Sequence, residues 1–354
     1  MKIIFVLLFL MLLTLPIELR AQTAEPEKIQ KTGKTLISVP VTVSDREGRY
    51  ISGLKKEDFT VYQGGVKQNI AFFAIYNEPL NIALLLDTSG STKVALEKIK
   101  DAAKDFITLL NPNDQCLVAT FDSQVNILNP FTSNHQTLKN SLDKVQTAEQ
   151  DGTVLHRAVG QIVQKSFSNV QGRKVIILLS DGKDFGSSVT KDELLNLLEE
   201  SDVLIYTIFY KTGVGFNKLI ISPDGTLKEG EQSKKPQKKL AQKKKKGYSI
   251  IISGQQNLPT EEEIELRERI ADIEAVDSLK KMSDTTAGRF YLSRDAPNLK
   301  ETFKKITSEL RQQYRLGYYS KDAATDASVH DINVKVERSD VVVRARGKFR
   351  VKQL

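Results

Sequence analysis

A run of apolar residues that ends in a polar cluster constrains the fold more than any other feature of this chain. Residues 81–86 are almost entirely apolar, and residues 87–91 (Asp-Thr-Ser-Gly-Ser) follow them directly. A continuous apolar run is typical of a central parallel strand, because helices cover both faces of such a sheet. We therefore expect the polar cluster at the carboxyl end of a buried strand, the edge where open α/β sheets bind ligands.

Predicted strands alternate with predicted helices along the segment 79–313. The strand patterns lie at 81–86, 116–121, 125–128, 174–179, 203–209 and 288–292. The helical patterns lie at 94–110, 138–145, 154–167, 191–200, 276–283 and 299–312. This alternation predicts an α/β fold with a doubly wound, mainly parallel sheet and right-handed crossovers.

The polar cluster permits two interpretations. Asp87 offers a carboxylate, Ser89 and Ser91 offer hydroxyl oxygens, and Gly90 allows a tight turn between them. A hard divalent cation such as Mg²⁺ prefers oxygen ligands of this kind. Asp, Ser and Thr are also ordinary caps at the start of a helix. The pentapeptide alone leaves metal binding and helix capping open.

Two further segments carry residues of the same kind. Residues 151–153 (Asp-Gly-Thr) open a predicted helix, and residues 180–182 (Ser-Asp-Gly) close the predicted strand at 174–179. Together with residues 87–91 they resemble, in order and spacing, the metal-ion-dependent adhesion site of von Willebrand factor A domains. Three motifs in register make this match specific.

The resemblance implies a bound cation, Mg²⁺ or Mn²⁺, and five residues around it. In that family the two serines and usually the threonine touch the metal, whereas the two aspartates act largely through water. An Asp or Glu carboxylate of a protein partner typically completes the shell. Carried over to this sequence, the metal-site residues are Asp87, Ser89, Ser91, Thr153 and Asp181.

The flanks of the α/β segment predict a small accessory β unit. Residues 35–78 contain strand patterns, of which 35–43 is interrupted by Pro40, a sign of an edge or a break. Residues 314–354 contain three more, and we expect 330–337 and 341–347 to pair across 338–340. Both flanks resemble a secreted bacterial subgroup of von Willebrand A proteins, abundant in acidobacteria. We expect them to form one β-sandwich.

The amino terminus resembles a secretory signal peptide. Lys2 precedes the apolar stretch 3–13, and a small residue, Ala21, marks the expected cleavage point of segment 1–21. The polar residues 22–34 are expected to be a disordered linker. This predicts a secreted protein, or one of the periplasm or cell envelope. The alternative is an uncleaved signal that anchors the chain in the membrane.

A lysine-rich insertion is predicted at about 211–274. Residues 228–246 hold nine lysines and two glutamates, followed by a charged helical pattern at 261–277. Such a charge block is usually a solvated loop. The more specific alternative to a solvated loop is weak contact with anionic surfaces through Lys234–Lys246. The formal net charge of the 354 residues is +8, and the single cysteine, Cys116, is expected to be buried.

The leading functional hypothesis is an exported, non-enzymatic module that binds a protein partner through a divalent metal. We expect a monomer that has no specific affinity for nucleic acid. One alternative is a metal-dependent hydrolase, for which His156 is the only nearby residue expected to titrate near neutral pH. The other is an envelope protein that acts through its lysine-rich insertion.

Overall fold

The computed structural model describes residues 35–75, 78–148, 152–210, 219–221, 227–229, 261–293, 295–320 and 329–350. The predicted signal peptide, the linker, Asp151 and the lysine block at 234–246 lie outside these residues. Within them, none of the helices combines the length and the apolar character that a membrane crossing requires.

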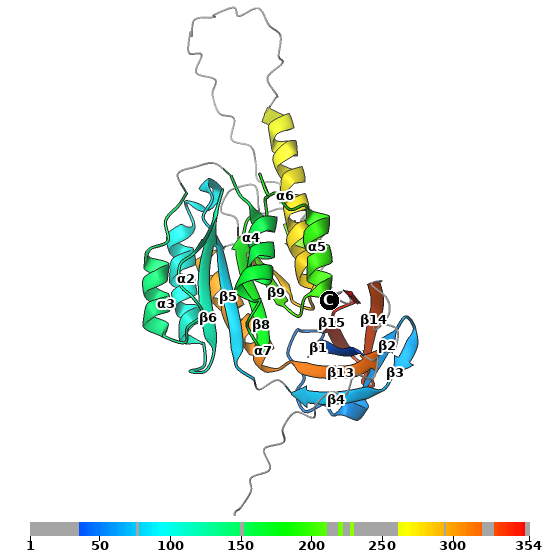
Figure 1. Cartoon of the computed structure of the whole chain (residues 1–354). Coiled ribbons are helices and arrows are strands. Elements are labelled where there is room, and N and C mark those ends of the chain that lie inside the picture. The colour runs from blue at the N-terminus through cyan, green and yellow to red at the C-terminus, as the bar shows by residue number, and fades with distance from the viewer. Residues whose placement is uncertain are drawn as a thin grey trace, which may run out of the picture.

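A six-stranded sheet forms the centre of the larger unit (Figure 1). Its order is β12-β9-β8-β5-β6-β7, and every pair is parallel except β6 with β7. The strands are β5 (Leu80–Asp87), β6 (Gln115–Phe121), β7 (Val125–Ile127), β8 (Arg173–Ser180), β9 (Leu204–Tyr210) and β12 (Phe290–Ser293). The predicted α/β fold with a mainly parallel sheet is confirmed.

Helices cover both faces of this sheet. They are α2 (Leu96–Thr108), α3 (His135–Asp143), α4 (Leu155–Gln161) with the π-helical turn η3 (Ile162–Ser166), α5 (Lys191–Glu200), α6 (Glu261–Thr285) and α7 (Ala296–Arg311). Successive residues of β5 point to opposite faces. Leu84 and Leu86 pack in one core with α2, α3 and α7, whereas Ala83 and Leu85 pack in a second core with α4, α5 and α6.

The strand order places the carboxyl end of β5 at a topological switch point. The chain passes from β5 to β6 on one side, and β8 lies on the other side of β5. At such a point the connections leave in opposite directions, and open α/β sheets bind their ligands there. Asp87, the last residue of β5, lies there with Ser180, the last residue of β8.

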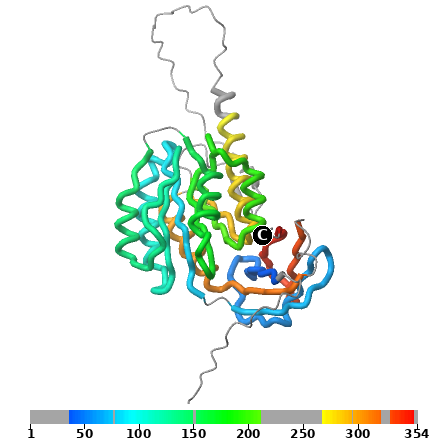
Figure 2. Tube along the Cα trace, in the orientation of Figure 1, coloured from blue at the N-terminus to red at the C-terminus, as the bar shows by residue number. Residues whose placement is uncertain are grey.

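The two flanks form a β-sandwich, as expected. One sheet has the order β15-β1-β13-β4 and the other β16-β14-β2-β3. Figure 2 shows the blue and the orange-red segments, which are far apart in sequence, side by side in this unit. The strands are β1 (Thr35–Asp45), β2 (Phe59–Gln63, after the 3-10 turn η1, Lys56–Asp58), β3 (Val66–Gln68), β4 (Ile70–Ile75), β13 (Tyr314–Ser320), β14 (Val329–Val336), β15 (Val341–Ala345) and β16 (Lys348–Arg350).

The predicted pairing of 330–337 with 341–347 is wrong. β14 pairs with β2 and β16, and β15 pairs with β1, so the two strands lie in opposite sheets. The chain crosses the sandwich between them at Asp340, whose φ is 60°. Alternating apolar residues indicate the buried face of a strand but do not identify its partner.

Four further expectations can be compared with the structure. Among the described residues, Pro40 lies where β1 pairs with β13 alone, because β15 reaches only residues 41–45 of β1, so the predicted edge position is confirmed. The two helical patterns at 261–277 and 276–283 are one continuous helix, α6. Part of the predicted insertion forms a short hairpin of β10 (Leu219–Ile221) and β11 (Leu227–Glu229). Cys116 is fully buried, as expected.

Candidate metal centre

Asp87 is a buried carboxylate with both oxygens engaged. Its Oδ1 accepts hydrogen bonds from the backbone N–H and the hydroxyl of Ser89, at 2.9 and 2.6 Å. Its Oδ2 accepts a hydrogen bond from the Ser180 hydroxyl at 2.6 Å. The side chain is therefore held in one orientation by residues from two neighbouring strand ends.

The two serines of the cluster lie together beside Asp87. The Ser89 and Ser91 hydroxyl oxygens are 3.1 Å apart. They lie at the 3-10 turn η2 (Gly90–Thr92). The buried Thr92 hydroxyl fixes this turn, because it donates to the carbonyl oxygens of Asp87 and Ser89 at 3.0 and 2.8 Å. Ser91 is exposed, so the site is open to solvent on that side.

Helix capping does not explain the polar cluster. Ser89 stands at the N-cap of η2 and Ala95 at the N-cap of α2, and neither side chain caps its helix. The hydroxyl of Ser89 instead points to the carboxylate of Asp87. Of the two interpretations that the sequence permits, the cation site therefore agrees better with the geometry.

Asp181 brings a second buried carboxylate to the site. It follows β8 directly and is 3% exposed. Its Oδ1 accepts a long hydrogen bond of 3.3 Å from the Lys183 N–H, and its Oδ2 is buried with no hydrogen-bond partner in the described part of the chain. Burial, and then the negative charge of Asp181, raise the pKa of Asp87 to about 6. The negative charges of the two carboxylates therefore repel each other.

Thr153 reaches the same edge through a backbone bridge. Its N–H donates to the Phe185 carbonyl at 3.2 Å, and the Phe185 N–H donates to the Thr153 carbonyl at 2.7 Å. Phe185 lies four residues after Asp181, so this bridge ties the threonine segment to the Asp181 loop. Thr153 itself is 5% exposed.

Gly182 allows the Asp181 loop to approach α6. Its φ is +75°, a conformation that favours glycine, and a Cβ there would lie 2.8 Å from the Ala275 carbonyl oxygen. Its N–H donates to the Ser180 hydroxyl at 2.8 Å. The same hydroxyl thus accepts from Gly182 while donating to Asp87, which orients both strand-end loops.

His156 lies beside this loop in an enclosed position. Its backbone N–H donates to Asp184 Oδ1 at 3.0 Å, and its ring Nδ1 is 3.4 Å from Asp184 Oδ2. Its Nε2 lies 3.5 Å from the Ser278 hydroxyl, and burial lowers the pKa of the ring. Both ring nitrogens therefore face protein groups, and the imidazole joins α4, the Asp181 loop and α6.

Sequence reasoning did not identify three polar residues that support the site, namely Asp122, Ser180 and Asp184. The Thr88 hydroxyl donates to Asp122 Oδ2 at 3.1 Å and to the Phe121 carbonyl at 3.2 Å, which fixes the loop after β6 to the loop after β5. Asp184 and Ser180 make the contacts described above. Only Ser180 had a signal in the sequence, its position in the Ser-Asp-Gly motif; the others depend on tertiary contacts.

The donor set fits a hard divalent cation. Asp87, Asp181, Ser89 and Ser91 lie at the carboxyl ends of β5 and β8, and the backbone bridge to Phe185 ties Thr153 to the Asp181 loop. One buried carboxylate oxygen, Asp181 Oδ2, has no hydrogen-bond partner in the described part of the chain. A cation there would offset the repulsion between Asp87 and Asp181. Among the described residues, no group of three or more His, Cys, Asp or Glu side chains is arranged to hold a metal. A cation at this edge would therefore be held by two carboxylates together with hydroxyl oxygens.

A family model matches the segment that carries these loops. Residues 82–183 match the family model of the von Willebrand factor type A domain. The match begins in β5 and ends two residues beyond Asp181, so it includes Asp87, Ser89, Ser91 and Thr153 as well. No curated protein matches the sequence.

The solved structures that match this chain share little sequence with it. BatB from Bacteroides thetaiotaomicron is 15% identical, covers 66% of this chain and 100% of its own, and gives a TM-score of 0.41. Proximal thread matrix protein 1 from the mussel byssus, with a zinc-occupied MIDAS motif, is 16% identical over 71% and 50%, with a TM-score of 0.46. The SpRpn10 VWA domain is 11% identical over 64% and 94%, with a TM-score of 0.38.

Proposed function

We propose that this chain is an exported module for protein binding, in adhesion or assembly, and that it acts through a divalent metal. The metal is Mg²⁺ or Mn²⁺, and the partner offers an Asp or Glu carboxylate. One observation carries the proposal. Asp181 Oδ2 is buried without a hydrogen-bond partner in the described chain, beside Asp87 and two clustered serine hydroxyls.

The chain's own residues divide the work at this site. Ser89, Ser91 and Thr153 would offer neutral oxygens, while Asp87 and Asp181 would supply negative charge. Ser180 and Thr92 hold the strand-end loops in place through their hydroxyls. A cation bound by so few charges remains electrophilic and attracts a further carboxylate. The exposed Ser91 marks the side from which a partner would approach.

Calorimetric titration with MgCl₂ and MnCl₂ tests the metal site. The wild-type chain should bind one cation, and Asp181→Ala should bind at least about tenfold more weakly, since it removes one of two carboxylates. Asp101→Asn, an exposed carboxylate on α2, is the matched control and should titrate like wild type. Equal affinity in wild type and Asp181→Ala would contradict the proposed site.

A pull-down in Mg²⁺ and in chelator tests the role in binding. Candidate partners are proteins that the wild-type chain retains in Mg²⁺ and releases in chelator. Asp181→Ala should not retain them, whereas Asp101→Asn should. A partner that wild type and Asp181→Ala retain equally, with or without Mg²⁺, would contradict bridging through the metal. It would favour the alternative in which Lys234–Lys246 bind an anionic surface.

We also propose that the chain is not an enzyme. The histidine of this region, His156, is enclosed between Asp184 and Ser278, which supports a structural role for it. Phosphatase and esterase substrates tested with and without Mg²⁺ should show no turnover above background. Metal-dependent turnover that disappears in Asp181→Ala would instead support the hydrolase alternative.

A further inference from the structure

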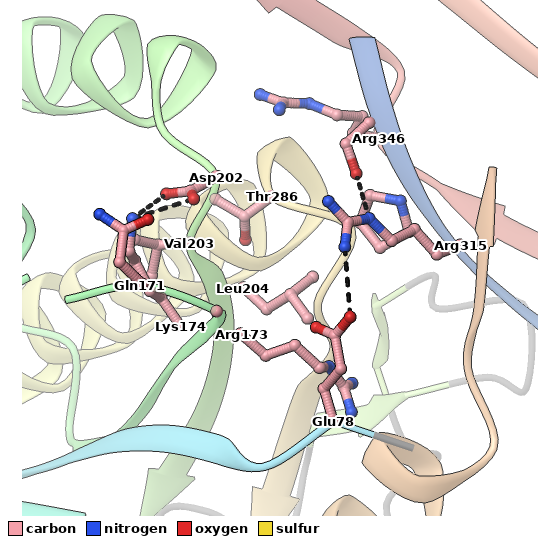
Figure 3. Close-up of a pocket in the computed structure, with 13 residues that line it drawn as sticks. Glu78, Gln171, Arg173, Lys174, Asp202, Val203, Leu204, Thr286, Arg315 and Arg346 are labelled. Atoms are coloured by element: carbon pink, nitrogen blue, oxygen red, sulfur yellow. Dashed lines mark hydrogen bonds and ion pairs between the residues drawn. The ribbon is translucent and has the colours of Figure 1, made fainter. Parts of the chain in front are cut away.

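Figure 3 shows a cavity of about 510 Å³. It lies at the amino ends of β8 and β9, the opposite end of the sheet from the metal centre. Its walls come from both units. Ser38 and Arg315 belong to the β-sandwich, whereas Lys174 and Leu204 stand at the amino ends of β8 and β9. The cavity therefore lies at the junction of the β-sandwich and the α/β unit, and neither the family match nor the proposed function assigns it a role.

The side chains around this cavity carry an excess of positive charge. Four are cationic and two are carboxylates: Arg173, Lys174, Arg315 and Arg346 against Glu78 and Asp202. Burial accentuates the difference. Arg173 and Arg346 are 5% and 9% exposed, whereas the side chains of Glu78 and Asp202 are 51% and 67% exposed. Solvent screens exposed charges more strongly than buried ones, so the interior of the cavity is electropositive.

The two buried guanidinium groups donate to neutral oxygens. Arg346 donates to the carbonyls of Glu199 and Ser201 at the end of α5, at 2.7 and 3.1 Å, and no carboxylate pairs with it in the described chain. Arg173 donates to the Leu310 carbonyl and to Gln313 Oε1, at 2.8 and 2.7 Å. Burial lowers the pKa of Arg346, although the negative charges of Asp202 and Glu199 act in the opposite direction.

Arg315 and Lys174 approach the cavity from opposite sides (Figure 3). Arg315 Nε donates to the Ser38 hydroxyl at 3.0 Å, while its Nη1 is 3.6 Å from Glu78 Oε1, a loose ion pair. Across the cavity, Lys174 Nζ pairs with Asp202 at 2.9 Å. A guanidinium beside a hydroxyl is a suitable donor set for a small oxyanion.

We propose that this cavity binds a small oxyanion, a phosphate or a carboxylate group, which displaces Glu78 from Arg315. The anion is held between Arg315 of the β-sandwich and Lys174 of the α/β unit, in the positive field of Arg173 and Arg346. Because the residues that bind the anion come from both units, the anion links the β-sandwich to the α/β unit. Its binding stabilises the folded chain, by an amount that grows with the logarithm of the anion concentration above the Kd.

Calorimetry of the full chain with sodium phosphate and with sodium succinate tests this site. The titrations are made in EDTA, so that no metal takes the anion, and NaCl keeps the ionic strength constant. Wild type should bind at least one of the two anions saturably, and the tighter one identifies the preferred group. Arg315→Gln should raise its Kd about tenfold or more, since a charge-assisted contact is lost.

A second variant gives an effect of opposite sign. Glu78→Gln removes the carboxylate that competes for Arg315, so it should lower the Kd several-fold. Lys300→Gln, which removes an exposed lysine of α7 paired with Asp105, is the control and should leave the Kd unchanged. The proposal is overturned if wild type binds neither anion, or if Arg315→Gln binds as tightly as wild type. Should Arg315→Gln not fold, an unchanged Kd in Glu78→Gln overturns it.

Discussion

Two carboxylates in one buried site make the metal centre unfavourable for the folded chain when no cation is bound. Asp87 is 1% exposed, and burial together with the charge of Asp181 raises its pKa from 3.8 to about 6. A folded-state pKa above the unfolded value means that folding stability falls as the pH rises from about 4 to about 6. Above that range the loss is complete, and we expect it to reach at most about 3 kcal/mol.

Asp87→Asn should therefore stabilise the metal-free chain at neutral pH. In EDTA at pH 7.5 we expect a gain of about 1 to 3 kcal/mol over wild type, which shrinks towards zero near pH 4. Urea unfolding at both pH values measures it, with Asp101→Asn as control. A variant that is less stable than wild type at pH 7.5 would show that the Ser89 and Ser180 hydrogen bonds outweigh the repulsion.

Two glycines of the Asp181 loop, Gly182 and Gly186, differ in whether a side chain would meet a neighbour. Both have positive φ, +75° and +95°, but a Cβ at Gly182 would meet the Ala275 carbonyl at 2.8 Å, whereas Gly186 has open space. We expect Gly186→Ala to cost about 1 kcal/mol and Gly182→Ala about 2 kcal/mol or more. Thermal unfolding compares them, and Gly182→Ala should also weaken Mg²⁺ binding because Asp181 moves. Equal costs would mean that α6 yields to the added methyl group.

At the scale of elements, α7 is joined to the sheet and to the β-sandwich by one buried carboxylate. Glu309 is fully buried and accepts hydrogen bonds from Tyr50 and Tyr206, at 2.5 and 3.0 Å, and from Tyr291 at 3.3 Å. Arg289 lies 3.5 Å away as its counter-charge. Tyr50 precedes β2, so this network spans both units. Burial and the negative charge of Glu309 raise the pKa of Tyr50.

Glu309→Ala should destabilise the chain by about 3 to 5 kcal/mol. It leaves a half-buried arginine without its anion and buried hydroxyls without an acceptor. Glu301→Ala, an exposed position of the same helix, is the matched control and should change the free energy of unfolding by less than about 0.5 kcal/mol. Urea unfolding gives both values. A loss below about 1 kcal/mol for Glu309→Ala would mean that water replaces the carboxylate.

Elements whose character is local could be predicted from the sequence, and those set by distant partners could not. β5 and β8 are continuous apolar runs, and their burial on both faces follows from that composition. The polar residues at the carboxyl ends of these two strands could be picked out from the sequence because each apolar run stops at them. The sheet assignment of β14 and β15, and the contacts of Asp122 and Asp184, depend on which segments meet in space. A single sequence does not indicate which distant segments contact each other.

At the scale of the whole molecule, the chain closes on itself at the β-sandwich. β1 to β4 precede the α/β unit and β13 to β16 follow it, yet they share one core that includes Val39, Val61 and Tyr318. β14 is central to the second sheet, because it lies between β2 and β16. The amino-terminal strands therefore cannot bury their apolar faces without the carboxyl-terminal ones.

Removal of residues 329–354 should unfold the β-sandwich and spare the metal centre. The deletion takes β14, β15 and β16 and exposes the shared core, including Val39 and Val61, to solvent. We expect a lower and broader thermal transition together with binding of a hydrophobic dye. Mg²⁺ affinity should stay within about threefold of wild type, because Asp87, Ser89 and Asp181 depend on β5 and β8. Loss of Mg²⁺ binding in a truncated chain that keeps its helical circular dichroism would show that the α/β unit needs the β-sandwich to form its site.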